Sequence, residues 1–137
     1  MQTDALADFD ILRPYRPAHI TNQKNASEHI GRKIIRVYSV ESTYHNDGFT
    51  VRYYSKQIIT ALDNVFHSLD GKVMSGGYIS PFIDAIQTSG ADGRGETDYF
   101  KFKCYQNGNL HIEFKRLDLL KIFNAVAGGA NLPSGTL

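Results

Sequence analysis

Two side chains that can transfer protons lie two residues apart, at His111 and Glu113. Residues at this spacing on a β-strand point to the same side. An imidazole and a carboxylate would then share one surface, where Lys101 or Lys103 could hold a phosphate or a developing oxyanion. These residues could perform general acid–base chemistry, with His111 and Glu113 as candidate catalytic residues and Lys101 or His67 assisting them.

The same stretch also has what a nucleic-acid surface needs. Such a surface requires positive charge for the phosphates and aromatic planes for the bases, and spacing alone does not separate binding from catalysis. The expected nucleic-acid contacts, in addition to His111, are Tyr99, Lys101, Lys103, Tyr105, Lys115, Arg116 and Arg94. A third interpretation is an ordinary solvated sheet face, stabilised by a cross-strand pair between Lys101 and Glu113.

A hairpin over 99–116 must position these side chains. Apolar residues alternate with polar ones in both arms, so the apolar set faces one way. Even-numbered residues oppose even-numbered residues only if the loop contains an odd number of residues. This predicts the three-residue loop Gln106–Gly108, in which Gly108 has a left-handed backbone conformation. The apolar face then consists of Phe100, Phe102, Cys104, Leu110, Ile112 and Phe114.

The rest of the chain predicts α+β architecture. β-rich stretches at 33–44 and 48–54 flank turn residues 45–48, which predicts a first hairpin. Helical periodicity follows Ser55 up to Gly71, follows Ser80-Pro81 to about Gly90, and follows Asp118 to Gly128. We expect an antiparallel sheet built from two hairpins with about three helices packed on one face, and a flexible connection at 91–95. The domain limits are an irregular N-terminal arm at 1–30, a single domain at 31–129 and a loose tail at 130–137.

Composition narrows the class of protein. The 137 residues suffice for one domain, the net charge is +1, and Cys104 is the only cysteine, which excludes a disulfide framework and suits the cytoplasm. The acidic start lacks the features of a signal peptide, and no segment reaches membrane-spanning length. The interval 101–121 carries five Lys or Arg against two acidic residues, which permits phosphate contact. The oligomeric state stays open.

Neither a metal nor a cofactor is predicted. His67, Asp70, His111 and Glu113 could act as ligands, but no two of them have a recognised zinc spacing. His67 and Lys72 have a structural explanation instead, because cations are favourable at the end of a helix. The glycines around Arg94 neither follow a convincing strand nor open a helix, so dinucleotide and phosphate-loop motifs are excluded by context.

The segments 66–72, 80–86, 93–100 and 105–119 together resemble a bacterial and phage domain-of-unknown-function family, number 4942. The resemblance covers about 64–129. Domains of this family often lie at the C-terminal side of predicted DNA methyltransferases on mobile elements, so the resemblance implies a setting in phage or plasmid DNA metabolism or defence. This chain itself carries no methyltransferase motifs.

The leading hypothesis is therefore an accessory module of a phage, plasmid or defence system. It would bind nucleic acid or a nucleic-acid-processing protein through the polar face of the 99–116 hairpin. One alternative is a small nuclease-like hydrolase that uses His111 and Glu113. The other is a protein-binding inhibitor or assembly domain.

Overall fold

The computed structural model describes residues 21–22, 30–43, 48–74 and 80–127. Two antiparallel sheets and three α-helices make up this part of the chain. The elements are β1 (Thr21–Asn22), β2 (Lys33–Arg36), β3 (Val40–Ser42), β4 (Phe49–Val51), the 3-10 turn η1 (Tyr53–Ser55), α2 (Lys56–Leu69), α3 (Pro81–Gln87), β5 (Arg94–Glu96), β6 (Phe100–Cys104), β7 (Leu110–Phe114) and α4 (Leu117–Ala127).

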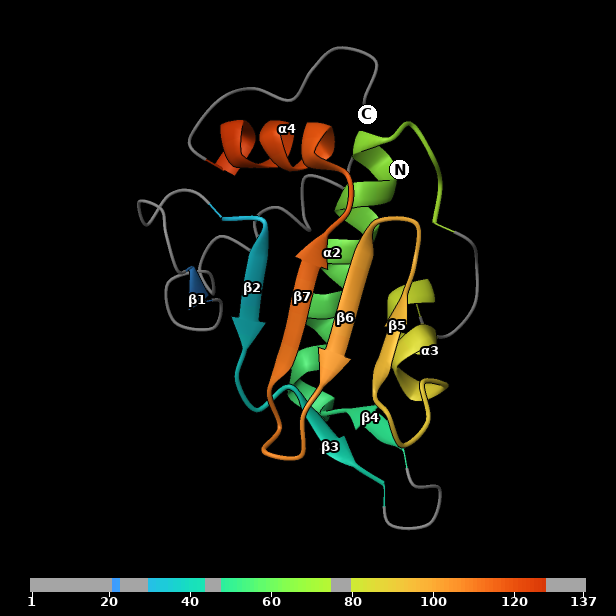
Figure 1. Ribbon diagram of the computed structural model, residues 1–137. Helices are drawn as coiled ribbons and strands as arrows, with labels where there is room; N and C mark the ends of the chain where they lie inside the picture. Colours follow the sequence, from blue (N-terminus) through green and yellow to red (C-terminus); the bar gives the residue numbers. More distant parts are fainter. Residues whose placement is uncertain (1–20, 23–29, 44–47, 75–79, 128–137) are drawn as a thin grey trace.

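The larger sheet has the strand order β1-β2-β7-β6-β5, with every neighbouring pair antiparallel, and β3 and β4 form the smaller sheet. Figure 1 shows α2 and α3 behind the larger sheet and α4 lying across one end of it. The other face of the sheet carries no helix in this view. The predicted α+β class with an antiparallel sheet is confirmed.

The β6–β7 hairpin has the predicted register. Lys101 lies opposite Glu113, and Lys103 lies opposite His111. The loop is closed by hydrogen bonds from Gly108 N to the Tyr105 carbonyl and from Tyr105 N to the Asn109 carbonyl, both 2.9 Å. Gly108 has φ +96°, a backbone conformation that glycine adopts without steric cost.

The first predicted hairpin is divided between the two sheets. The chain turns at Val37–Ser39, so β2 pairs with β7 whereas β3 pairs with β4. Tyr38 has φ +52° in this turn, and Ser39 N donates to the Gly108 carbonyl at 2.9 Å. Arg36, itself 4% exposed, donates to the buried Ser39 hydroxyl and fixes the turn from inside. The turn at 44–47 lies outside the described residues.

The prediction of a flexible connection at 91–95 is wrong, because Arg94–Glu96 forms the edge strand β5. The glycine that suggested flexibility serves close packing. A Cβ atom on Gly95 would lie 2.7 Å from the Phe102 ring, so only glycine admits that ring against β5.

The core lies between the larger sheet and the helices. Its centre is Phe66 of α2, whose ring centroid lies 5.3 Å from Phe100, 5.2 Å from Phe114 and 5.6 Å from Phe123. These rings join the sheet to both α2 and α4. Because apolar and polar residues alternate in β6 and β7, all the apolar side chains point to one face of the sheet, and the helices pack on that face. Cys104 is buried on the same face, as predicted.

The helix ends follow the sequence signals only in part. Ser80 caps α3 by accepting a hydrogen bond from Ile83 N at 3.1 Å. Ser55 stands at the start of α2 but makes no capping bond, because its hydroxyl contacts Ser39 and Arg36. Asp118 was expected as the cap of α4, yet it lies in the first turn of a helix that begins at Leu117.

Part of the predicted N-terminal arm belongs to the fold. Thr21 and Asn22 pair with β2, and buried Ile30 exchanges two 2.8 Å hydrogen bonds with the Asn124 side chain. The remainder of the arm and the tail at 130–137 lie outside the described residues. Among the helices that are described, none has the length and apolar character to cross a membrane.

Candidate functional site

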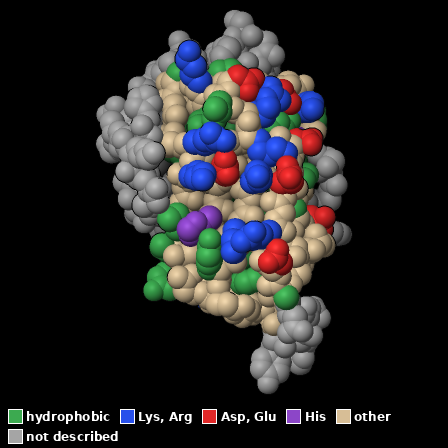
Figure 2. Space-filling model, in the orientation of Figure 1, with side chains coloured by type: hydrophobic (Ala, Val, Ile, Leu, Met, Phe, Trp, Pro, Cys, Tyr) green, Lys and Arg blue, Asp and Glu red, His purple; other side chains and the backbone are tan. Residues whose placement is uncertain are grey.

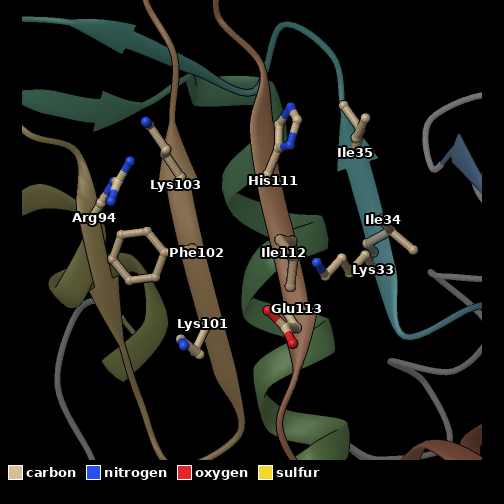
Figure 3. Close-up of a pocket in the computed structure, with 10 residues that line it drawn as sticks. All are labelled: Lys33, Ile34, Ile35, Arg94, Lys101, Phe102, Lys103, His111, Ile112 and Glu113. Carbon is tan, nitrogen blue, oxygen red and sulfur yellow. The ribbon is translucent and has the colours of Figure 1, made fainter.

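The helix-free face of the larger sheet carries a shallow hollow of about 470 Å³. Side chains from four adjacent strands surround it, and α2 lies behind those strands in the same view (Figure 3). It is lined by Lys33, Ile34, Ile35, Arg94, Lys101, Phe102, Lys103, His111, Ile112 and Glu113. The sheet register arranges its polar groups in two rows that run across the strands.

The first row, here called the glutamate row, alternates in charge. From β2 to β5 it consists of Lys33, Glu113, Lys101 and Glu96, each opposite the next. Arg32 also binds Glu113, with its Nη2 atom 3.0 Å from Oε2. The predicted Lys101–Glu113 pair is thus in register, but the carboxylate of Glu113 makes its ion pair with Arg32.

The second row, here called the histidine row, has no carboxylate. From β2 to β5 it consists of Ile35, His111, Lys103 and Arg94, again directly opposed. Lys103 and Arg94 are like charges on neighbouring strands, an arrangement that destabilises a sheet. In the described part of the chain, neither cation has an acidic group within 4.0 Å.

His111 lies at the centre of the histidine row. Its ring centroid is 4.4 Å from that of Tyr105, and the Lys103 ammonium lies 5.0 Å from the centre of the same tyrosine ring. Partial burial, and then the positive charge of Lys103, lower the pKa of His111 below its usual 6.5. The imidazole is therefore neutral at pH 7, and its neighbours do not prepare it to hold a proton.

The structure does not assemble the predicted acid–base group. His111 and Glu113 lie on the same face of β7 but in different rows, and no hydrogen bond joins them in the described structure. His67 belongs to α2, on the opposite side of the sheet. Its Nδ1 atom lies 2.8 Å from the Asp63 carbonyl and 3.3 Å from Asp63 Oδ1. His67 therefore does not reach the hollow, whereas Arg94 and His111 both line it.

Tyr99 cannot stack on a nucleobase. This corrects the expectation that, as an odd-numbered residue of the hairpin, it lies on the polar face. It is 1% exposed, and its hydroxyl donates to Asp70 Oδ2 at 2.8 Å. Tyr99 lies just before β6 begins, where strand alternation does not apply, and its ring packs edge-on against His67 at 4.8 Å. Burial and the bond to Asp70 raise the pKa of the phenol.

Two predicted cationic contacts are neutralised by neighbours. Lys115 binds Glu96 at 2.6 Å and the Thr97 carbonyl at 2.8 Å. Arg116 forms a bidentate pair with Asp118, at 3.0 and 2.8 Å, and lies 3.2 Å from Asp70. These ion pairs offset most of the positive charge of Lys115 and Arg116, which leaves less of it for a ligand. Arg94, Lys101, Lys103 and Tyr105 remain at the hollow or its rim.

Sequence reasoning missed the contribution of β2. Lys33 and Ile35 line the hollow, and both alternate with buried Ile34 and Arg36 in the manner of a strand with one open face. That alternation was a usable signal, but the pairing of β2 with β7 was not evident. Figure 2 shows Lys and Arg side chains over this face, with Asp and Glu side chains among them and a histidine beside them.

The comparisons with known proteins give a family but no activity. No curated protein and no solved structure matches the chain significantly. Among the described residues, no group of three His, Cys, Asp or Glu side chains could hold a metal ion. The family model for the "Domain of unknown function (DUF4942)" matches residues 3–131, so the relationship extends well before the 64–129 segment that suggested it. The chain belongs to the DUF4942 family.

Proposed function

We propose that this chain is an accessory nucleic-acid-binding module that holds phosphate groups in the hollow of the larger sheet. Arg94, Lys101 and Lys103 contact the phosphates, joined by Lys33, and Tyr105 contributes a stacking surface. The proposal includes the setting that the resemblance implied, a phage, plasmid or defence system in the bacterial cytoplasm.

The observation that carries the proposal is the direct opposition of Lys103 and Arg94. Like charges on neighbouring strands repel each other, and in the described structure no carboxylate offsets this pair. A bound polyanion would remove the repulsion and release counterions. The neutral His111 and the ring of Tyr105 beside the pair suit a ligand that carries planar groups as well as phosphate.

The test is binding of labelled DNA and RNA by the wild type and by Arg94→Gln, Lys103→Gln and Lys121→Gln. The first two variants remove charge from the hollow, whereas Lys121 is an exposed cation on α4 and makes a matched control. Binding is measured over a series of salt concentrations. The slope of log affinity against log salt is negative, and it should become less steep by roughly 0.7–0.9 for each lost phosphate contact. The Lys121→Gln slope should equal that of the wild type.

Two results would contradict the proposal. One is equal binding by all three variants, and the other is no salt-dependent binding to any nucleic acid. Cleavage of the same samples, abolished in His111→Ala, would favour the nuclease-like alternative. Co-purification with a protein through the same face, without nucleic-acid binding, would favour an assembly domain.

A further inference from the structure

Four exposed tyrosines lie at one end of the molecule, beside the hollow. Their exposed fractions are 90% for Tyr53, 63% for Tyr38, 59% for Tyr54 and 36% for Tyr105. They come from three separate segments: the turn after β2, the 3-10 turn before α2, and the loop after β6. We call these four residues the tyrosine end.

Hydrogen bonds and close contacts connect the segments that carry Tyr38, Tyr54 and Tyr105. Tyr54 Oη donates to the Tyr38 carbonyl at 2.8 Å. Tyr38 also lies over the tip of the β6–β7 hairpin, since a Cβ atom on Gly108 would be 3.7 Å from its ring atom Cδ1. Gly108 N in turn donates to the Tyr105 carbonyl. Tyr54, Tyr38 and the hairpin loop that carries Tyr105 are thus joined, and Tyr53 stands next to Tyr54 in the same 3-10 turn.

Tyr38 adopts an unusual backbone conformation to reach this surface. Its φ of +52° makes it the one non-glycine residue with positive φ in the described part of the chain. Glycine or asparagine normally fills such a position, and a bulky residue there is typical of functional sites that the surrounding structure holds in place. Buried Arg36 supplies that support, because its Nε donates to Ser39 Oγ at 3.0 Å and its Nη2 donates to Ser55 Oγ at 3.2 Å.

The tyrosine end continues directly into the cationic hollow. Tyr105 connects the two, because its ring centroid lies 4.4 Å from that of His111 and 5.0 Å from the Lys103 ammonium, and both of these residues line the hollow. A ligand that follows this path meets cations first and exposed aromatic rings next. An extended chain with phosphates along its backbone and planar groups on flexible links matches that order.

We infer that the ligand is a single-stranded nucleic acid whose phosphates lie in the hollow and whose bases stack on the tyrosine end. This inference rests on the proposed function and makes it more specific. In a duplex the base faces are stacked inside the helix, so a duplex could use the lysines but not the tyrosines. A single strand offers both groups at once, and each base stacked on an aromatic ring strengthens binding by about fivefold or more.

The test compares one labelled oligonucleotide, single-stranded and annealed to its complement, at fixed salt. The variants are Tyr53→Ala, Tyr38→Gly and the control Val73→Ala. Val73 is 67% exposed and follows the opposite end of α2, about 21 Å along a helix of 14 residues. The side chain of Tyr53 is too exposed to support the fold, and glycine suits the φ of Tyr38, so thermal unfolding should show that both variants fold.

The expected result is a preference of the wild type for the single strand. Tyr53→Ala or Tyr38→Gly should weaken single-strand binding by about fivefold or more, with duplex binding and the salt slope unchanged. Val73→Ala should change neither. Equal binding of both forms, with tyrosine variants unchanged and Lys103→Gln impaired, would overturn the inference and leave the proposed function standing. Failure of the wild type to bind either form of the oligonucleotide would overturn both the inference and the proposed function.

Discussion

Asp63 is a fully buried carboxylate that joins α2 to α3, and its replacement tests how the helices are held together. Its Oδ2 atom accepts a 2.9 Å hydrogen bond from Phe82 N, and its Oδ1 atom lies 3.3 Å from Nδ1 of His67. Burial acts to lower the pKa of His67, but the hydrogen bonds and charge of Asp63 outweigh it and raise that pKa above 6.5. The imidazole is thus protonated, and the contact charged, at mildly acidic pH.

Asp63→Ala removes both contacts. The buried Phe82 N–H is left without an acceptor, which costs about 1–3 kcal/mol. Losing one partner of a buried ion pair brings the total to about 3–5 kcal/mol. For a chain of this size each kcal/mol corresponds to about 3–5 °C, so the midpoint of thermal unfolding should fall by roughly 10–25 °C.

Asp63→Asn separates charge from hydrogen bonding, because an amide oxygen can still accept from Phe82 N–H. In wild type the folded-state pKa of His67 is raised, so its stabilising contribution is complete below pH 6.5 and disappears as pH rises through that pKa. In Asp63→Asn the carboxylate no longer opposes the effect of burial, so folding favours the protonated imidazole less than in the wild type. The loss of unfolding free energy should therefore be larger near pH 5.5 than near pH 8.5.

The assay is urea unfolding followed by circular dichroism at both pH values. The wild type and His67→Gln serve as references, since His67→Gln should remove most of the pH dependence of the difference. A loss in Asp63→Asn that is the same at both pH values would refute the ion-pair account. A loss under about 1 kcal/mol in Asp63→Ala would refute the whole argument.

Three further predictions concern the sheet. His111 should titrate in NMR below pH 6.5, and Lys103→Gln should raise its midpoint, because burial and then Lys103 lower the pKa; a midpoint above 6.5 would contradict this. Gly95→Ala should lower the free energy of unfolding in urea by about 1–3 kcal/mol, since the new methyl group would lie 2.7 Å from the Phe102 ring, and an unchanged urea midpoint would refute that crowding. Burial raises the pKa of Cys104 to about 12, so thiol reagents at mildly alkaline pH should modify it only in urea; rapid labelling of the folded protein would show that the thiol is accessible.

The parts of the fold predicted best are those whose signals are local. Alternation over 99–116 and the odd loop established the register of β6 and β7, because neighbouring residues alone determine both. The α2 helix followed its apolar periodicity from Ser55 to the stop at Gly71. Position in the fold then decided which polar residues of the hairpin are accessible.

The errors arose where residues far apart in the chain decide the structure. Gly95 reads locally as a loop residue, but the Phe102 ring gives it a packing role within a strand. Tyr99 was assigned to the open face by alternation, yet its hydroxyl donates to Asp70, which directly follows α2 on the helix side of the sheet, and its side chain is buried there. The contributions of Lys33 to the hollow and of Tyr38 to the tyrosine end depend on a turn within a stretch that reads as one strand.

The pairing of β2 with β7 also bears on how the chain reaches its native state. Lys33 lies opposite Glu113, so the centre of the larger sheet joins segments separated by most of the domain. Closing so long a loop is entropically costly, which makes slow, late docking of β2 the expected folding behaviour. Until β2 arrives, β7 is an unprotected edge with free backbone donors and acceptors. A proteolysed chain that lacks residues before Val37 would expose that edge and tend to aggregate through it.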